Sequence, residues 1–198
     1  MPEVKPECIL VVDLEATCWD QPLPSTGEKQ TVDDMEVIEF GCALATADGE
    51  VLSSASFMVK PVVHPELSNF CKGLTGIEQE QVDAAPRYAE AVAQLDRWLS
   101  EQRQPDLWCS WGNYDNRQLQ AEERRHQVAP AFMQLPHYNL KQVWCQSHDK
   151  PMRTSLRKAL AFHNMEFRGR LHRGIDDAEN IARLLPYVNW QLAEASEK

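Results

Sequence analysis

The sequence predicts an α/β fold in which a mixed central sheet is flanked by helices. Its first third contains three apolar runs, two of them joined by a hairpin signal, and the later part alternates a short apolar run with segments of helical periodicity. Strands that first pair as hairpins and then alternate with helices are typical of a mixed sheet in a layered structure. The 198 residues, 43% of them hydrophobic, suit one domain over residues 1–198 with a core at about residues 7–190.

The predicted strands come early in the chain. The first is the apolar run that ends at Asp13 and Glu15, and residues 36–46 and 51–62 form the next two. Between these two, Asp48-Gly49 is a strong hairpin signal, so we expect an antiparallel three-strand start. Residues 106–111 are expected to form a short buried strand.

Helical periodicity dominates the rest of the chain. The expected helices cover residues 65–74, 76–85, 86–102, 115–127, 141–147, 155–163 and a last segment from about Ile175. In the third of these, Val92, Leu95 and Leu99 keep helical spacing, and the last carries Ile181 and Leu184, with Leu185, on one face.

Charge and cysteine usage restrict the function classes. The net charge of −10 excludes a broad electrostatic grip on a long nucleic acid, although local basic positions such as Arg168, Arg170 and Arg173 remain. The six cysteines form no C-x-x-C pair, which indicates reduced core residues. The sequence shows no signal peptide and no apolar run near the ~20 residues of a membrane span, so we expect a cytoplasmic protein without membrane contact.

Two carboxylates end the first strand. Asp13 and Glu15 are two residues apart and project to the same face, where they repel each other unless a cation lies between them. Mg²⁺ binds through one or two carboxylates together with substrate phosphates. About four or five Asp/Glu pairs with this spacing are expected by chance in such an acidic chain, so the pair alone is weak evidence.

Acids in two later segments, and a histidine beside one of them, strengthen this interpretation. Asp115 follows a short apolar run at a helix start, where an N-cap role is the simpler explanation. Asp176 and Asp177 also fall near a helix start, where negative charge is favourable. His172 lies just upstream in a basic, glycine-flanked loop. Together with the first pair, this set matches two-metal phosphodiester hydrolysis, in which carboxylates hold the ions and a base activates water.

The same segments resemble a known family, the DEDDh 3′–5′ exonucleases of the ribonuclease H-like fold. The likeness runs through "VVDLEATC", "EVIEFG", "WGNYDNRQL" and "GRLHRGIDDAENIARLL", and "LSNFCKGLTGI" points to the Eri-1 and 3′hExo exoribonuclease branch. The resemblance therefore implies a three-layer ribonuclease H-like fold.

Site residues follow from the resemblance position by position. It implies that the acids which bind two divalent ions, Mg²⁺ or Mn²⁺, are Asp13, Glu15, Asp115 and Asp177. His172 would be the general base, and the His-x4-Asp spacing selects Asp177 over Asp176. For the terminal nucleotide it implies contacts from Thr17, Phe70, Leu74 and Tyr114, the last at a position where animal relatives carry Trp. Base–aromatic stacking of this kind tolerates any sequence.

Several alternatives remain open from the sequence. From spacing alone, an ordinary core aromatic is the simpler explanation of Phe70. Either Glu36 or Glu39 could lie near the metals or be a paired strand acid. The expected activity is 3′–5′ hydrolysis of single-stranded RNA or DNA ends, with RNA preferred, to nucleoside 5′-monophosphates. A DNA exonuclease, an oligoribonuclease-like scavenger and a non-catalytic nucleic-acid-binding module are the competing hypotheses. Whether the protein has a protein partner is not revealed by the sequence.

Overall fold

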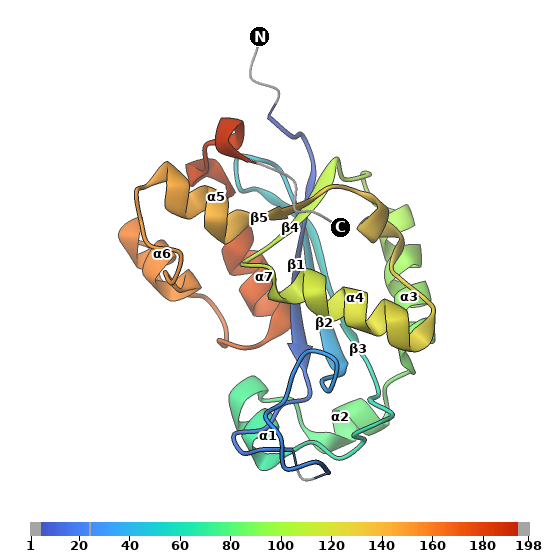
Figure 1. The fold of residues 1–198 in the computed structure, drawn as a ribbon. Helices are drawn as coiled ribbons and strands as arrows, with labels where there is room; N and C mark the ends of the chain where they lie inside the picture. The colour runs from blue at the N-terminus through green and yellow to red at the C-terminus, as the bar shows by residue number, and fades with distance from the viewer. Residues whose placement is uncertain (1–4, 24, 194–198) are drawn as a thin grey trace.

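The computed structural model describes residues 5–23 and 25–193, which form a five-stranded mixed sheet with helices on both faces (Figure 1). The strand order is β3-β2-β1-β4-β5. The strands are β1 (Ile9–Ala16), β2 (Val37–Ala45), β3 (Val51–Met58), β4 (Leu107–Ser110) and β5 (His137–Asn139). The predicted α/β class with a mixed central sheet is therefore confirmed.

The pairing of the strands agrees with the expected antiparallel start. β1 pairs with β2, and β2 with β3, in antiparallel register, whereas β4 joins β1 and β5 joins β4 in parallel. Strand β5 was not predicted, because three residues are too few to show a period-2 pattern.

The expected helices form close to their predicted bounds. They are α1 (Asn69–Thr75), α2 (Gln79–Asp83), α3 (Tyr88–Ser100), α4 (Tyr114–His126), α5 (Leu140–Ser147), α6 (Leu156–Phe162) and α7 (Gly174–Ala182). Three short 3₁₀ helices cover Ala131–Gln134, Leu185–Tyr187 and Trp190–Leu192. Helix α7 ends before the predicted stripe does, and Leu184 and Leu185 complete the same buried cluster from beyond its end. Within the described residues, no helix is long and apolar enough to cross a membrane.

Alternation along β1 divides the core into two layers. Ile9 and Val11 face the cluster built by α5, α6 and α7, while Leu10, Val12 and Leu14 face the cluster built by α3 and α4. Figure 1 shows these two helix groups on opposite sides of the sheet. Asp13 and Glu15 continue the odd-numbered positions, so both point to the side of α7.

Candidate active site

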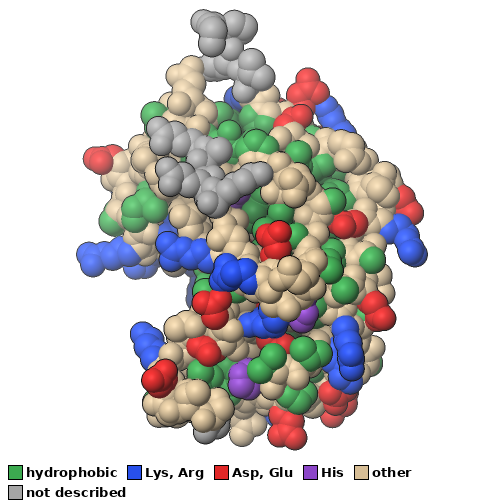
Figure 2. All heavy atoms as spheres, turned by 45° about the vertical axis from the view of Figure 1, so that its right-hand side comes forward, with side chains coloured by type: hydrophobic (Ala, Val, Ile, Leu, Met, Phe, Trp, Pro, Cys, Tyr) green, Lys and Arg blue, Asp and Glu red, His purple; other side chains and the backbone are tan. Residues whose placement is uncertain are grey.

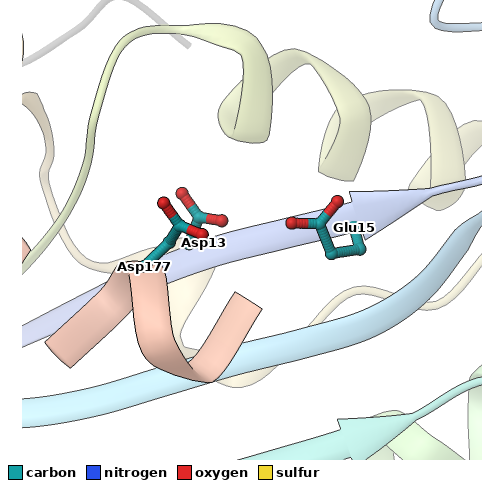
Figure 3. Close-up of side chains that lie close together, drawn as sticks. All are labelled: Asp13, Glu15 and Asp177. Carbon is teal, nitrogen blue, oxygen red and sulfur yellow. The ribbon is translucent and has the colours of Figure 1, made fainter. Parts of the chain in front are cut away.

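Three carboxylates from β1 and α7 gather at one place. Asp13, Glu15 and Asp177 each offer an oxygen, and these oxygens all lie within 4.8 Å of one another. Figure 3 shows Asp13 and Asp177 with their carboxyl groups side by side and Glu15 further along the strand. Asp176 points elsewhere, because its Oδ2 accepts a 2.7 Å hydrogen bond from the backbone N–H of Arg170. The choice of Asp177 over Asp176 from spacing thus agrees with the geometry.

Two glycines allow α7 to approach the sheet closely enough for this gathering. A Cβ on Gly41 of β2 would lie 1.9 Å from the carbonyl carbon of Gly174, and one on Gly174 would lie 2.9 Å from the carbonyl oxygen of Asp13. Gly41 is also the cross-strand partner of Asp13 in the β1–β2 register. Since no larger residue fits at either position, this contact sets the distance between α7 and β1.

A buried carboxylate fixes the start of α7. Glu39 accepts hydrogen bonds from the hydroxyl of Ser56 at 2.6 Å and from the backbone N–H of Gly174 at 3.0 Å, and forms an ion pair with Arg173 at 3.1 Å. Asp177 itself accepts a 3.2 Å bond from the backbone N–H of Arg173. Glu39 is therefore a paired strand acid that holds the helix carrying Asp177 in place.

Asp115 joins the site from the first turn of α4. It is not the N-cap, since Asn113 occupies that position and the helix begins at Tyr114. Instead, Oδ1 of Asp115 on α4 accepts a 3.0 Å hydrogen bond from the backbone N–H of Leu14 on β1. The N-cap interpretation of Asp115 was therefore wrong, and the side chain lies beside the strand that carries Asp13 and Glu15.

Burial and mutual repulsion disfavour ionisation of these acids. Burial raises the pKa of Glu15 to about 9, with further contributions from Asp177, Glu39 and Asp115. The pKa of Asp13 is raised well above its usual value by burial and then by Asp115, Asp177 and Glu15. Burial also raises the pKa of Asp115 and of Asp177 to about 6 each. Such clustering of perturbed acids is typical of a site that receives a cation.

His172 lies at the edge of the same pocket in an uncommon backbone conformation. Its φ of 61° falls in the left-handed region, which non-glycine residues seldom adopt and which is frequent at functional sites. The side chain is exposed, yet partial burial of the ring lowers its pKa below the usual 6.5, so the imidazole is neutral at pH 7. A neutral imidazole can accept a proton.

A pocket of about 480 Å³ opens over the four acids and His172. Its walls include Leu74 and Tyr114, two of the four residues expected around the terminal nucleotide. The other two lie off these walls. Phe70 is exposed on α1, and Thr17 is buried with its hydroxyl accepting a 2.9 Å bond from the backbone N–H of Glu36.

Some residues that shape the site escaped the sequence analysis. Gly41 and Gly174 carry a signal only in hindsight, as glycines inside a strand and at a helix start. The pocket walls also include Trp111, Ser155, Leu156 and Arg157. Nothing in the sequence links residues 155–157 to the acids, because the contact is made only by the tertiary fold.

Comparison with known proteins agrees with this geometry. The Exonuclease family model matches residues 10–185. Human ERI1 exoribonuclease 3 is 30% identical over 92% of this chain and 53% of its own length, and the fission yeast 3′-5′ exonuclease eri1 is 27% identical over 89% of this chain and 66% of its own. ERI1 exoribonuclease 2 of Xenopus laevis is 29% identical, with 28% of its length covered, so the chain spans only part of these relatives.

Solved structures give the same result. The nuclease domain of 3′hExo, described as a DEDDh family member bound to rAMP, matches with a TM-score of 0.79 at 28% identity, over 93% of this chain and 92% of that one. E. coli exonuclease I in complex with a dA16 oligonucleotide matches with a TM-score of 0.66 at 12% identity over 91% of this chain and 40% of that one, which shows a shared fold. The chain belongs to the exonuclease family, as an Eri1-like and 3′hExo-like DEDDh member with the ribonuclease H-like fold.

Proposed function

We propose that this chain is a metal-dependent 3′–5′ exonuclease that hydrolyses single-stranded nucleic acid, with RNA preferred, to nucleoside 5′-monophosphates. The observation that carries the proposal is the cluster of Asp13, Glu15 and Asp177, three carboxylates that form no salt bridge within the described residues. Its relatives named as exoribonucleases support RNA as the substrate.

The donor set fits hard divalent cations. Carboxylate oxygens from three side chains, with raised pKa values and no protein cation between them, suit Mg²⁺ or Mn²⁺. Asp13, Glu15 and Asp177 would hold one ion, and Asp13 would bridge to a second that Asp115 helps to place. When bound, such ions supply positive charge that lowers the pKa of water and stabilises negative charge on the phosphate.

The remaining residues act on the attacking water and on the terminal nucleobase. His172, neutral at pH 7, takes a proton from the attacking water at one ring nitrogen. Tyr114 and Leu74 lie on the pocket wall, where a terminal base can pack against an aromatic face and an apolar side chain. Phe70, exposed on α1, would be a second stacking residue, and Thr17 a further contact to the terminal nucleotide.

Product analysis tests the reaction. We would incubate equal-length 5′-labelled single-stranded RNA and DNA with Mg²⁺, Mn²⁺ or EDTA, beside an Asp13→Asn variant. The expected result is a metal-dependent ladder that shortens from the 3′ end and is absent in the variant, with RNA degraded faster. A faster rate on DNA would favour a DNA exonuclease, and preference for very short strands a scavenger.

Binding without cleavage would favour the non-catalytic module. For this outcome to hold, both strands must stay intact with either metal while the protein still retains them in a filter-binding assay. We also propose a cytoplasmic location, supported by six free cysteines, which cell fractionation would test.

A further inference from the structure

One segment of this acidic protein is strongly basic. Residues 150–165 contain four cationic side chains and no Asp or Glu, whereas the whole chain has a net charge of −10. The four are Lys150, Arg153, Arg157 and Lys158. We call this set the α6 basic face, because it covers the loop before α6 and the first turn of that helix.

The cations of the α6 basic face are open to solvent. All four side chains are exposed, and Arg153, Arg157 and Lys158 form no ion pair with any part of the chain that the structure describes. The ammonium group of Lys150 lies 4.8 Å from the centre of the Phe162 ring. In Figure 2, Lys and Arg side chains gather along the upper edge of a hollow, at the height of α6 in Figure 1.

This face is continuous with the candidate active site. Ser155, Leu156 and Arg157 form part of the pocket wall, so α6 borders the space above Asp13 and Asp177. Among the described residues, no acid forms an ion pair with Arg157 on that border. A polyanion whose end enters the pocket would pass them as it leaves.

We propose that the α6 basic face binds the phosphodiester backbone of the nucleotides just upstream of the 3′ end. This inference rests on the proposed function and adds the path of the nucleic acid upstream of the active site. Contacts to phosphates carry no sequence information, which suits an enzyme that removes successive nucleotides. Such a local contact also offsets the repulsion between the strand and a protein of charge −10.

Salt dependence gives the proposal a quantitative form. For single strands, the slope of log K against log salt is about −0.7 for each phosphate neutralised. Three or four contacts therefore predict a slope of about −2 to −3 for a long strand. A dinucleotide reaches fewer of these cations and should show a shallower slope.

The test uses paired charge-neutral variants and two substrate lengths. We would measure kcat/KM for a 5′-labelled 12-nucleotide RNA and for a dinucleotide, over a range of KCl concentrations, in the wild type and in Arg153→Gln/Lys158→Gln. The matched control is Arg87→Gln/Arg97→Gln, which also removes two exposed cations but around α3, on the other side of the sheet. Thermal unfolding of each protein monitors folding.

The α6 variant should lower the ratio of kcat/KM for the long RNA to that for the dinucleotide by about 3- to 10-fold and make the long-RNA salt slope shallower by about 1.4. The control should change neither. Equal length ratios and salt slopes in the wild type and the α6 variant would overturn the inference while leaving the proposed function intact. No cleavage of either substrate by the wild type would instead refute the proposed function itself.

Discussion

Two groups of buried or half-buried carboxylates lie in this fold and differ in what compensates their charge. The first group is Glu36, Glu39 and Glu122, and the second is Asp13, Glu15 and Asp177. Members of the first group are surrounded by donors from the protein, whereas members of the second face one another. A buried charge without a partner is costly, and within the described residues only the first group has its charge compensated by donors of the protein.

The first group shows how this chain neutralises a buried acid. Both oxygens of Glu36 accept hydrogen bonds, at 2.8 to 3.1 Å, from the backbone N–H groups of Val62, Val63 and His64. Glu122 accepts from the backbone N–H of Val37 at 2.8 Å and pairs with Arg125 at 2.8 Å and His126 at 3.1 Å. Glu36 and Glu39, which the sequence left open as metal-site acids, are therefore structural.

The acids of the second group are surrounded by one another rather than by protein donors. Within the part of the chain that the structure describes, the hydrogen bonds to these acids are local, such as that from the backbone N–H of Arg173 to Asp177. Their pKa values rise because each carboxylate is buried among the others. The comparison shows that the number of protein donors around an acid, rather than its burial, distinguishes the structural acids from the candidate metal-site acids.

The largest expected effect is that of Asp13→Asn, which tests whether the second group binds metal. We expect activity to fall by about 10³-fold or more, because the variant removes charge that would hold the metals. Metal-free stability should not decrease, since one repulsive charge is gone. Kinetics and thermal unfolding without metal measure both effects. If Asp13→Asn unfolds the protein, Asp13 belongs with the structural acids.

His172 borders the second group without being an acid, so its substitution tests proton transfer separately from metal binding. His172→Asn should lower activity by about 10²- to 10⁴-fold, the usual contribution of a general base. Wild-type activity should rise with pH through a pKa below 6.5 and then level off, because only the neutral imidazole accepts a proton. The variant should lose this rise.

Asparagine is the appropriate substitution at this position. It tolerates the left-handed backbone at φ 61°, so the fold should be kept, whereas His172→Ala should cost about 1 kcal/mol or more of stability. Full activity in His172→Asn would remove the base assignment.

Glu36→Gln tests the first group and should give the opposite pattern. An amide in place of the carboxylate turns an NH₂ group toward backbone N–H donors, so we expect a loss of about 2–3 kcal/mol in unfolding free energy. For a chain of this size that corresponds to a fall in Tm of roughly 5–10 °C. Activity below the transition should stay within about tenfold of the wild type. A loss like that of Asp13→Asn, without a change in Tm, would contradict the distinction.

The sequence predicted the acids better than it predicted what positions them. Asp13 and Glu15 share a face because strand periodicity is strictly two. The family resemblance, through its His172-x4-Asp177 spacing, pointed to the carboxylate that lies beside them. The Gly41–Gly174 contact was not predictable, because it joins residues 133 positions apart and depends on the packing of α7 against β2. Likewise, a single sequence does not show which buried glutamate finds backbone donors.

The smallest effect that we expect is the gain in stability from bound metal, which depends on pH. Folded Glu15 has a pKa of about 9 against an ordinary 4.5, and Asp115 and Asp177 have about 6 against 3.8, so the folded state binds more protons than the unfolded chain. By linkage, the unfolding free energy of the metal-free protein falls as pH rises from about 4 to 9.

Mg²⁺ or Mn²⁺ should counteract this fall, because bound cations favour the ionised carboxylates. At ten times Kd the gain is about 1.4 kcal/mol, and it should be larger at pH 8 than at pH 5. Thermal unfolding with EDTA and with each metal at both pH values measures it, with Asp13→Asn as the control that should gain less. An equal metal response in that variant would mean that the ions bind outside the second group, and the contrast between the two sets of acids would lose its functional meaning.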